Sequence, residues 1–359
     1  MLFRSERSNT VLRNPQLLTG HVPSLNDLLK LLNAADVKRV QLDSASVYRK
    51  QLVSDDGSQF TVFGDDGVKR YGQPIGVVKS AKFKVNEQGK IDDVHSKVRC
   101  RCNCTAPTKL TNRQQRSVSW LYRELQVLTD PLLRQHENIV KLLYYDLVQE
   151  SAGIVAPALL MEKASFGSLD HFLESQSVPI SHQDRMLLCE DLTHALLALH
   201  TCGIAHGDVK VANALVFEVD DPTAPEGEGE VSQKRFLAKL ADFGSSISLE
   251  MEPGSMIYYG TPMTNAPEVE RQSSEHPFRA EDMLKCDIYS LGLLYVNVLT
   301  GRLDDCLITK NSSVLAHALT AVRGLGLEQE IETLMSGALT KLLPYDPNDR
   351  ISDLSLILR

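Results

Sequence analysis

The sequence predicts an α+β protein with a small β-rich lobe followed by a larger, mainly helical lobe. Short alternating or β-branched stretches occupy much of residues 46–85, notably 58–63 and 75–83. A helical run follows over residues 113–129, and beyond about residue 165 the apolar residues recur with helical spacing. With 359 residues, 43% of them apolar, the chain is long enough to bury a sizeable core.

The first 45 residues are expected to form an N-terminal extension with one amphipathic stretch. Leucines cluster within residues 24–32, and Ser24 or Asn26 is a suitable N-cap for a helix there. A short helix that packs on the domain behind it is the favoured interpretation. A helix that docks a partner is the alternative.

The two lobes are predicted to span residues 46–162 and 163–359. The hinge between them should lie near residues 161–164, where a buried strand ends. Each lobe carries one segment whose composition disfavours packing and predicts a surface insertion. The first, at about 88–115, is basic, and the second, at about 219–233, is acidic and rich in Pro and Gly.

Composition excludes several classes of protein. The net charge of −8 argues against a general nucleic-acid-binding surface. No apolar run reaches the roughly 18 residues that a membrane span needs. Since the first residues lack the apolar core of a secretory signal, a cytoplasmic or nuclear protein is expected, with its seven cysteines reduced.

Three short motifs carry the chemistry. Residues 206–213 read His-Gly-Asp-Val-Lys-Val-Ala-Asn, residues 241–244 read Ala-Asp-Phe-Gly, and residues 265–268 read Asn-Ala-Pro-Glu. Their order and separations resemble the catalytic loop, the magnesium loop and the end of the substrate-docking (P+1) loop of eukaryotic-type protein kinases. The resemblance covers residues 46 to about 355 and implies a two-lobed kinase that uses ATP and Mg²⁺ to phosphorylate proteins in signalling.

The resemblance assigns a role to each residue of the phosphoryl-transfer site. Asp208 would accept the proton of the substrate hydroxyl, and Lys210 would steady the γ-phosphate. Asn213 and Asp242 would be the magnesium ligands, because hard oxygen atoms suit that ion. Lys210 favours serine and threonine over tyrosine as acceptors.

Lys79 is the favoured lysine for the α- and β-phosphates, because residues 76–79 resemble the Val-Ala-x-Lys strand of kinases. Lys82 and Lys84 compete with it, although Lys82 should face the opposite side of an extended strand. Glu124, on the next predicted helix, is the expected ion-pair partner, and a solvated helix charge is the alternative.

The glycine-rich loop departs from the family pattern. With Val62 as the closing valine, only Gly57 of the three glycines is retained, and Asp55 and Phe60 replace the others. Backbone amides approach phosphates best where no side chain intervenes, so nucleotide affinity is the weak point. If the resemblance to kinases is set aside, residues 55–58 indicate a hairpin turn between two strands. Two hinge residues complete the expected nucleotide site, Glu162 and Ala164.

Gly207 replaces the arginine that usually precedes the catalytic aspartate. The chain therefore resembles a non-RD kinase, whose activation should not depend on a pair between that arginine and a phosphorylated residue. The His-Gly-Asp variant, together with residues 57–62, resembles a divergent group of kinases from filamentous fungi.

Further residues are expected to support the site. Thr261 resembles the P+1 threonine, which contacts the catalytic aspartate and lysine. Asp287 should hold the backbone of the catalytic loop, and Glu268 should pair with Arg350. These last three residues are expected to be structural.

A cysteine-rich stretch permits a metal interpretation. Cys100, Cys102 and Cys104, with His95 nearby, have ligand chemistry suited to a soft metal. Their spacing differs from the paired Cys-x-x-Cys of zinc ribbons. An exposed basic loop with reduced thiols is therefore favoured.

The predicted function is transfer of the γ-phosphate of ATP to serine or threonine hydroxyls of proteins. The alternative is a pseudokinase, an interaction module with little turnover, which the altered glycine-rich loop favours. A kinase-fold transferase for small molecules fits less well, because Thr261 and residues 266–268 imply a groove for a peptide.

Overall fold

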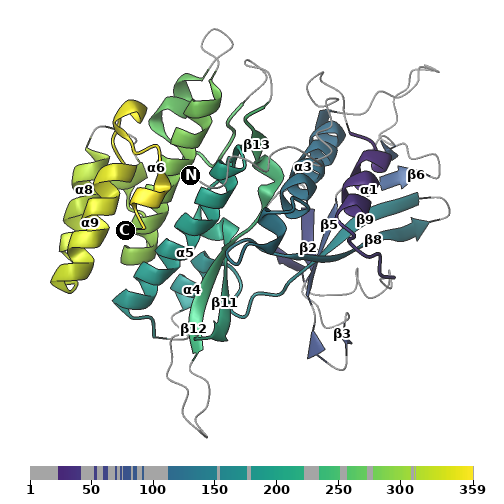
Figure 1. Ribbon diagram of the computed structural model, residues 1–359, viewed down its shortest axis with the longest axis horizontal. Helices are drawn as coiled ribbons and strands as arrows, with labels where there is room; N and C mark the ends of the chain where they lie inside the picture. The colour runs from purple at the N-terminus through teal and green to yellow at the C-terminus, as the bar shows by residue number, and fades with distance from the viewer. Residues whose placement is uncertain are drawn as a thin grey trace, which may run out of the picture.

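The computed structural model describes residues 23–41, 52–54, 60–63, 69–70, 73–74, 76–81, 84–86, 91–92, 112–151, 154–175, 179–221, 234–250, 257–272, 278–308, 311 and 313–358. Within these ranges, no helix is both long enough and apolar enough to cross a membrane. The predicted α+β architecture with two unequal lobes is confirmed (Figure 1).

The small lobe is built on an antiparallel sheet. Among the described residues the strand order is β1-β2-β5-β9-β6-β7, and β8 also pairs with β9. The strands are β1 (Leu52–Ser54), β2 (Phe60–Phe63), β5 (Val77–Ala81), β6 (Lys84–Asn86), β7 (Ile91–Asp92), β8 (Leu142–Ser151) and β9 (Ile154–Met161). A separate pair is formed by β3 (Lys69–Arg70) and β4 (Gln73–Pro74). The strands predicted over 58–63 and 75–83 correspond to β2 and β5.

Two helices lie side by side against this sheet (Figure 1). Helix α3 (Asn112–Leu128) is the helix predicted over residues 113–129, and its leucines enter the core because 121, 125 and 128 share one face. The basic insertion expected at 88–115 therefore ends earlier, since residues 112–115 are helical. The cysteine-rich stretch lies outside the described residues.

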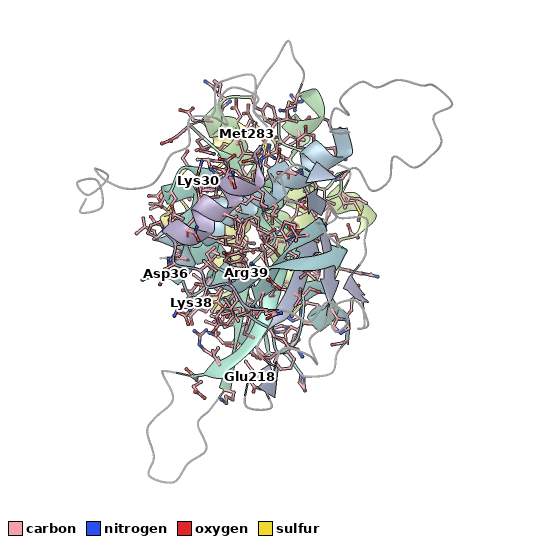
Figure 2. The ribbon with its side chains drawn as sticks, turned by 90° about the vertical axis from the view of Figure 1, so that its right-hand side faces the viewer. Lys30, Asp36, Lys38, Arg39, Glu218 and Met283 are labelled. Carbon is pink, nitrogen blue, oxygen red and sulfur yellow. The ribbon has the colours of Figure 1, made fainter. Side chains whose placement is uncertain are left out.

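Helix α1 (Leu25–Ala34) confirms the helix expected in the N-terminal extension. Ser24 caps it through a reciprocal capping box with Asp27. Leu28 and Leu32 are buried, 2% and 3% exposed, so the apolar face packs on the domain as favoured. Figure 2 labels the exposed Lys30 of α1 and, after the helix, the exposed Asp36, Lys38 and Arg39.

The large lobe is organised around helix α6 (Ala280–Thr300). Most residues of its middle are buried, because other helices surround it. Helices α5 (His182–Thr201), α8 (Val314–Arg323) and α9 (Gln329–Leu342) pack on it, and the lobe also contains α4 (Leu169–Ser175) and α7 (Asp305–Ile308). Short 3₁₀ turns join the elements: η2 (Leu133–Gln135), η3 (Val211–Asn213), η4 (Phe243–Ser245), η5 (Pro267–Arg271), η6 (Pro347–Asp349) and η7 (Leu354–Leu356).

Four strands inside the helical lobe were not anticipated from the sequence. They form two antiparallel pairs, β10 (Ile204–Ala205) with β13 (Ile247–Ser248) and β11 (Ala214–Asp220) with β12 (Lys234–Leu240). The acidic insertion expected at 219–233 begins later than predicted, because residues 219–220 are the paired end of β11, and residues 222–233 are outside the described ranges. These strand pairs carry the loops that form the candidate site.

The two lobes meet at the end of β9 and along β12. Strand β9 ends at Met161, at the hinge that the sequence predicts. The Val140 amide donates to the carbonyl of Leu240 at 3.0 Å, and the Leu240 amide donates to that of Asn138 at 2.8 Å. One apolar core includes residues of both lobes, so the lobes are packed together as well as linked.

Candidate active site

Lys79 lies between two carboxylates from distant parts of the chain. Its Nζ is 2.7 and 2.8 Å from the two carboxylate oxygens of Glu124 on α3, and 3.0 Å from Oδ1 of Asp242. The Lys79 and Glu124 side chains are 11% and 1% exposed. Burial alone would lower the pKa of Lys79, but the charges of Asp242 and Glu124 outweigh it and raise the pKa. The lysine is therefore cationic.

The pleat of β5 explains why Lys79 occupies this position. Val78 is buried on the other face of the sheet, in a small cluster with residues of β8 and β9. Lys79 pairs with Val62 on β2 and with Leu159 on β9, which places it in the interior of the sheet. Of its two competitors, Lys84 belongs to a different strand, β6, and Lys82 lies outside the described residues.

Asp242 is held in an uncommon backbone conformation. Its φ is 59°, in the left-handed region that non-glycine residues rarely adopt, immediately before η4. Such conformations are often found at functional sites. Burial would raise the pKa of the Asp242 carboxyl, but the Lys79 charge outweighs this effect and lowers it. Asp242 therefore presents an anion to the space beside Lys79.

Three polar side chains surround Asp208: Lys210 and Asn213 come from the loop before and within η3, and Thr261 comes from a distant segment. The Oδ1 of Asp208 accepts the Thr261 hydroxyl at 2.7 Å, and its Oδ2 lies 3.0 Å from the Lys210 Nζ. The same lysine donates to the Thr261 hydroxyl at 2.8 Å. Asn213 donates from Nδ2 to Oδ2 of Asp208 at 3.0 Å and to its carbonyl at 2.8 Å. The predicted contacts of Thr261 with Asp208 and Lys210 are confirmed.

The two clusters are joined through the backbone. The Ala241 amide donates to the Asn213 carbonyl at 2.8 Å, and His206 Nε2 contacts the Ala241 carbonyl at 3.1 Å. Asp242 follows Ala241 directly. The loop carrying Asp208 and the loop carrying Asp242 therefore lie next to each other.

The donor set fits a hard divalent cation such as Mg²⁺. Both hydrogen bonds of the Asn213 amide group to Asp208 use Nδ2, so its Oδ1 is the atom left to bind a metal. Asp242 uses Oδ1 for Lys79, and its side chain is 42% exposed, which leaves Oδ2 for a second bond. An amide and a carboxylate oxygen from adjacent loops match the ligand chemistry of this ion.

Comparison with known proteins identifies this arrangement. A family model described as a protein kinase domain matches residues 88–358. The chain belongs to the protein kinase family. The match begins after Lys79 and does not include it. Lys79 is connected to the matched region by its ion pair with Glu124.

The kinase is also similar to characterised relatives. It is 31% identical over 187 residues to the serine/threonine-protein kinase ULK1 of Homo sapiens, which covers 52% of this chain and 16% of that protein. It is 30% identical over 179 residues to the serine/threonine-protein kinase dst2 of Dictyostelium discoideum, which covers 49% of this chain and 14% of that protein. The chain thus aligns with only about one-seventh of the length of these relatives.

At the hinge of the kinase, the Glu162 side chain is already engaged. It accepts the Lys141 amide at 2.9 Å and pairs with Lys239 of β12 at 2.8 Å. The Glu162 amide also donates to the Lys141 carbonyl at 3.0 Å, and Ala164 follows two residues later in a segment without regular secondary structure. Lys239 was missed from the sequence. The available signal was a lysine inside an otherwise apolar run, residues 236–241.

The described residues contain only part of the glycine-rich loop. β1 and β2 pair in antiparallel fashion on either side of residues 55–59, which agrees with a hairpin at that position. Gly57 lies outside the described residues. Val62 lies on β2 opposite Lys79, at the position expected of the closing valine.

The expected structural supports are confirmed. Arg350 binds Glu268 through two nitrogens, with Nη2 2.9 Å from Oε2, and its guanidinium lies 4.7 Å from the ring centre of Tyr289. Asp287 is fully buried and accepts the amides of His206 and Gly207 at 2.6 and 3.0 Å.

Proposed function

We propose that this protein kinase is catalytically active and transfers the γ-phosphate of ATP to serine or threonine hydroxyls of protein substrates. The observation that carries the proposal is the Asp208–Thr261–Lys210 triangle, in which each member contacts the other two. A catalytic carboxylate held in this way has its orientation fixed before the substrate binds.

In the proposed reaction, the substrate hydroxyl approaches Asp208 and its oxygen attacks the γ-phosphorus. The new O–P bond forms as the bond between the γ-phosphorus and the bridging oxygen breaks, and ADP leaves with that bond's electron pair. Asp208 receives the hydroxyl proton, and Lys210 offsets the negative charge beside the transferred group.

On the nucleotide side, Lys79 is proposed to hold the α- and β-phosphates while Glu124 orients it. Val62 and Gly57 would cover the nucleotide, and the hinge backbone at Glu162 and Ala164 would bind its base. Asn213 and Asp242 would hold Mg²⁺. When bound, this ion neutralises phosphate charge and aligns the leaving group.

The acceptor preference rests on Lys210 and Thr261, which resemble the serine/threonine branch of the family. Because Gly207 carries no side chain, the kinase is proposed to be of the non-RD type. Its activation would then be independent of an arginine–phosphate pair at that position.

A pseudokinase is the second candidate, favoured by one specific observation. Asp55 and Phe60 replace two of the three glycines that usually close over the phosphates. Such a module would keep the fold and bind partners with little or no turnover. It would share the nucleotide-binding residues, so binding of ATP alone does not separate the two candidates.

The deciding experiment is phosphate transfer from labelled ATP with Mg²⁺, to the protein itself and to a generic basic protein. The Asp208→Asn variant should lose roughly two to four orders of magnitude in rate, because its amide cannot accept the proton. Asp36→Asn is a matched control, since it makes the same chemical change at an exposed residue just beyond α1 (Figure 2). Equal background signals in the wild type and Asp208→Asn, with both proteins folded, would favour the pseudokinase.

A further inference from the structure

The backbone at Gly207 leaves no room for a side chain. Its φ is +80°, and a Cβ atom placed there would lie 2.3 Å from the carbonyl oxygen of Ser245. Two backbone segments, the one before Asp208 and the one after Asp242, therefore touch directly. No side chain at position 207 can reach from the catalytic loop to the segment that follows Asp242.

Tyr258, which follows Asp242 in the chain, connects its own segment to the catalytic loop through Asp287. Its side chain is 2% exposed, and its hydroxyl donates a hydrogen bond to Oδ1 of Asp287 at 2.9 Å. The same Oδ1 accepts the Gly207 amide at 3.0 Å. A single carboxylate oxygen thus binds both the catalytic loop and the activation segment, defined here as residues 242–268.

Asp287 is the shared receptor of this network. Its Oδ2 accepts the His206 amide at 2.6 Å and lies 3.0 Å from His200 Nε2. Burial would raise the pKa of Asp287, but its hydrogen bond with His200 and the other donors lower it, so the carboxylate stays charged. Burial and the Asp287 charge raise the pKa of Tyr258 well above its ordinary value, so the phenol keeps the proton that it donates.

Tyr258 lies three residues before Thr261, whose hydroxyl contacts Asp208. Between them, the Asn265 side-chain amide donates to the Tyr259 carbonyl at 3.0 Å, and the Asn265 side chain fills the space beside Gly260. The segment is therefore fixed at Tyr258, at Asn265 and at Thr261, where the hydroxyl meets Asp208. Movement at Tyr258 would be transmitted over three residues to the Asp208 contact.

We infer that Tyr258 is a positioning residue, whose hydroxyl ties the activation segment to the catalytic loop through Asp287 and so keeps Thr261 on Asp208. Tyr258 supplies from the activation segment a link that Gly207 has no side chain to make. The inference rests on the proposed kinase function, because its consequence for turnover presupposes that Asp208 is the catalytic base.

The test is Tyr258→Phe, which removes the hydroxyl and keeps the ring that fills the space. Tyr295→Phe is the matched control. The Tyr295 hydroxyl is also buried and lies 2.5 Å from the Thr193 hydroxyl. Tyr295 is in the C-terminal half of α6, whereas Asp287 is in the N-terminal half. Both variants lose a buried hydrogen bond, and the fall in Tm should be larger for Tyr258→Phe, because its partner is a charged carboxylate and that of Tyr295 is a neutral hydroxyl. Kinetic constants are measured well below Tm, per folded molecule.

We expect Tyr258→Phe to lower kcat about tenfold and to raise KM for a peptide substrate, as for the loss of one hydrogen bond to a charged group. KM for ATP should stay within about twofold, because the contacts of Lys79 are untouched. Tyr295→Phe should leave all three constants unchanged. Equal kinetic constants for the two variants would overturn the inference and leave Tyr258 a packing residue.

A second measurement does not need turnover. Amide hydrogen exchange should become faster in Tyr258→Phe at residues 206–208 and 258–265 but not on α9, whereas Tyr295→Phe should leave both segments as in the wild type. Unchanged exchange at these segments would overturn the tether. If the wild type transferred no phosphate, the proposed function would fail, while the exchange comparison would still decide whether Tyr258 tethers the loop.

Discussion

At the scale of single residues, two largely buried lysines of the described chain are each paired with carboxylates. Lys79 is neutralised by Glu124 and Asp242, and Lys239 by Glu162. A buried ion left alone by removal of its partner costs several kcal/mol, so these pairs constrain one another strongly. Sites that bind phosphates need fixed cations, and the pairing of Lys79 provides one.

Asp191 on α5 predicts a pH dependence of stability, because the effect of burial outweighs that of its polar partners. It accepts the Ala238 amide at 2.8 Å, and Arg235 is 4.0 Å away, but burial dominates and raises its pKa to about 7. Between about pH 4 and pH 7 the folded protein keeps a proton that the unfolded chain has lost. This group therefore makes the folded state less stable as the pH rises through that window.

We expect the Asp191→Asn variant to lack this slope. Its free energy of unfolding, relative to the wild type, should increase between about pH 5 and pH 8, because the neutral amide has no proton to lose. Urea unfolding at the two pH values measures the difference, with the exposed Asp36→Asn as control. A difference that does not change with pH would show that Asp191 ionises normally.

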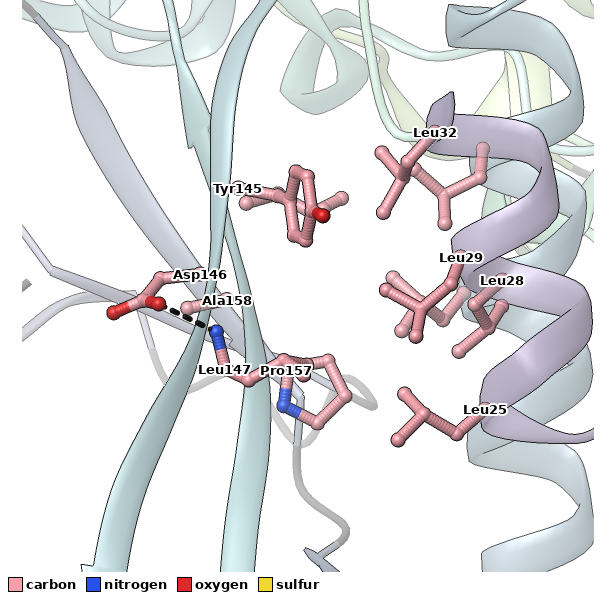
Figure 3. Close-up of a pocket in the computed structure, with 12 residues that line it drawn as sticks. Leu25, Leu28, Leu29, Leu32, Tyr145, Asp146, Leu147, Pro157 and Ala158 are labelled. Carbon is pink, nitrogen blue, oxygen red and sulfur yellow. Dashed lines mark hydrogen bonds between the residues drawn. The ribbon is translucent and has the colours of Figure 1, made fainter. Parts of the chain in front are cut away.

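At the scale of elements, α3 carries Glu124 and is supported by α1. A pocket lies between the two helices and strands β8 and β9, and it is lined from α1 by Leu25, Leu28, Leu29 and Leu32 (Figure 3). Beyond the helix, the Val40 amide donates to the Tyr145 carbonyl at 2.9 Å, and Arg39 pairs with the buried Asp146 at 2.9 Å. The segment 23–41 is thus bound to the small lobe by apolar and polar contacts.

Leu28→Ala should therefore destabilise the whole domain, by roughly 2 to 4 kcal/mol, because it opens a cavity between α1 and α3. Denaturant unfolding measures the change, and Asn33→Ala, on the exposed side of the same helix, should shift the midpoint little. Unfolding should remain one transition. A separate early transition, or no loss of stability, would mean that α1 is not part of the cooperative domain.

At the scale of the whole molecule, the candidate site is formed where the two lobes meet. The small lobe contributes Lys79 and Glu124, and the large lobe contributes Asp208 and Asp242. The activation segment packs on α6 through Tyr258 and does not rely on a side chain at Gly207. The activation segment is held on the large lobe by the Tyr258–Asp287 hydrogen bond, and the lobes are joined by the ion pair of Lys79 with Asp242.

Phosphatase treatment should consequently leave kcat within about twofold of the untreated enzyme, because no arginine precedes Asp208 to receive a phosphate. Mass spectrometry confirms removal of phosphate, and transfer to a peptide is measured before and after treatment. A large loss of activity would contradict this expectation.

The sequence by itself determined the parts that are local. Asp208, Lys210 and Asn213 lie within six residues of one loop, and together with the Asp-Phe-Gly that begins at Asp242 they carry the resemblance to protein kinases that assigns their expected roles. Helices α1 and α3 were predictable because their leucines recur with helical period. Lys79 was favoured over Lys82 and Lys84 because residues 76–79 resemble the Val-Ala-x-Lys strand of kinases.

Only the tertiary structure decided the contacts between residues far apart in the chain. Lys239 and Glu162 are separated by 77 positions, and Tyr258 and Asp287 by 29. Such pairs leave no local pattern, because each residue alone resembles an ordinary charge or a loop tyrosine. Strands β11 and β12 were hidden for a related reason: strand preference depends on the neighbours with which a strand packs, and those neighbours are fixed only by the fold.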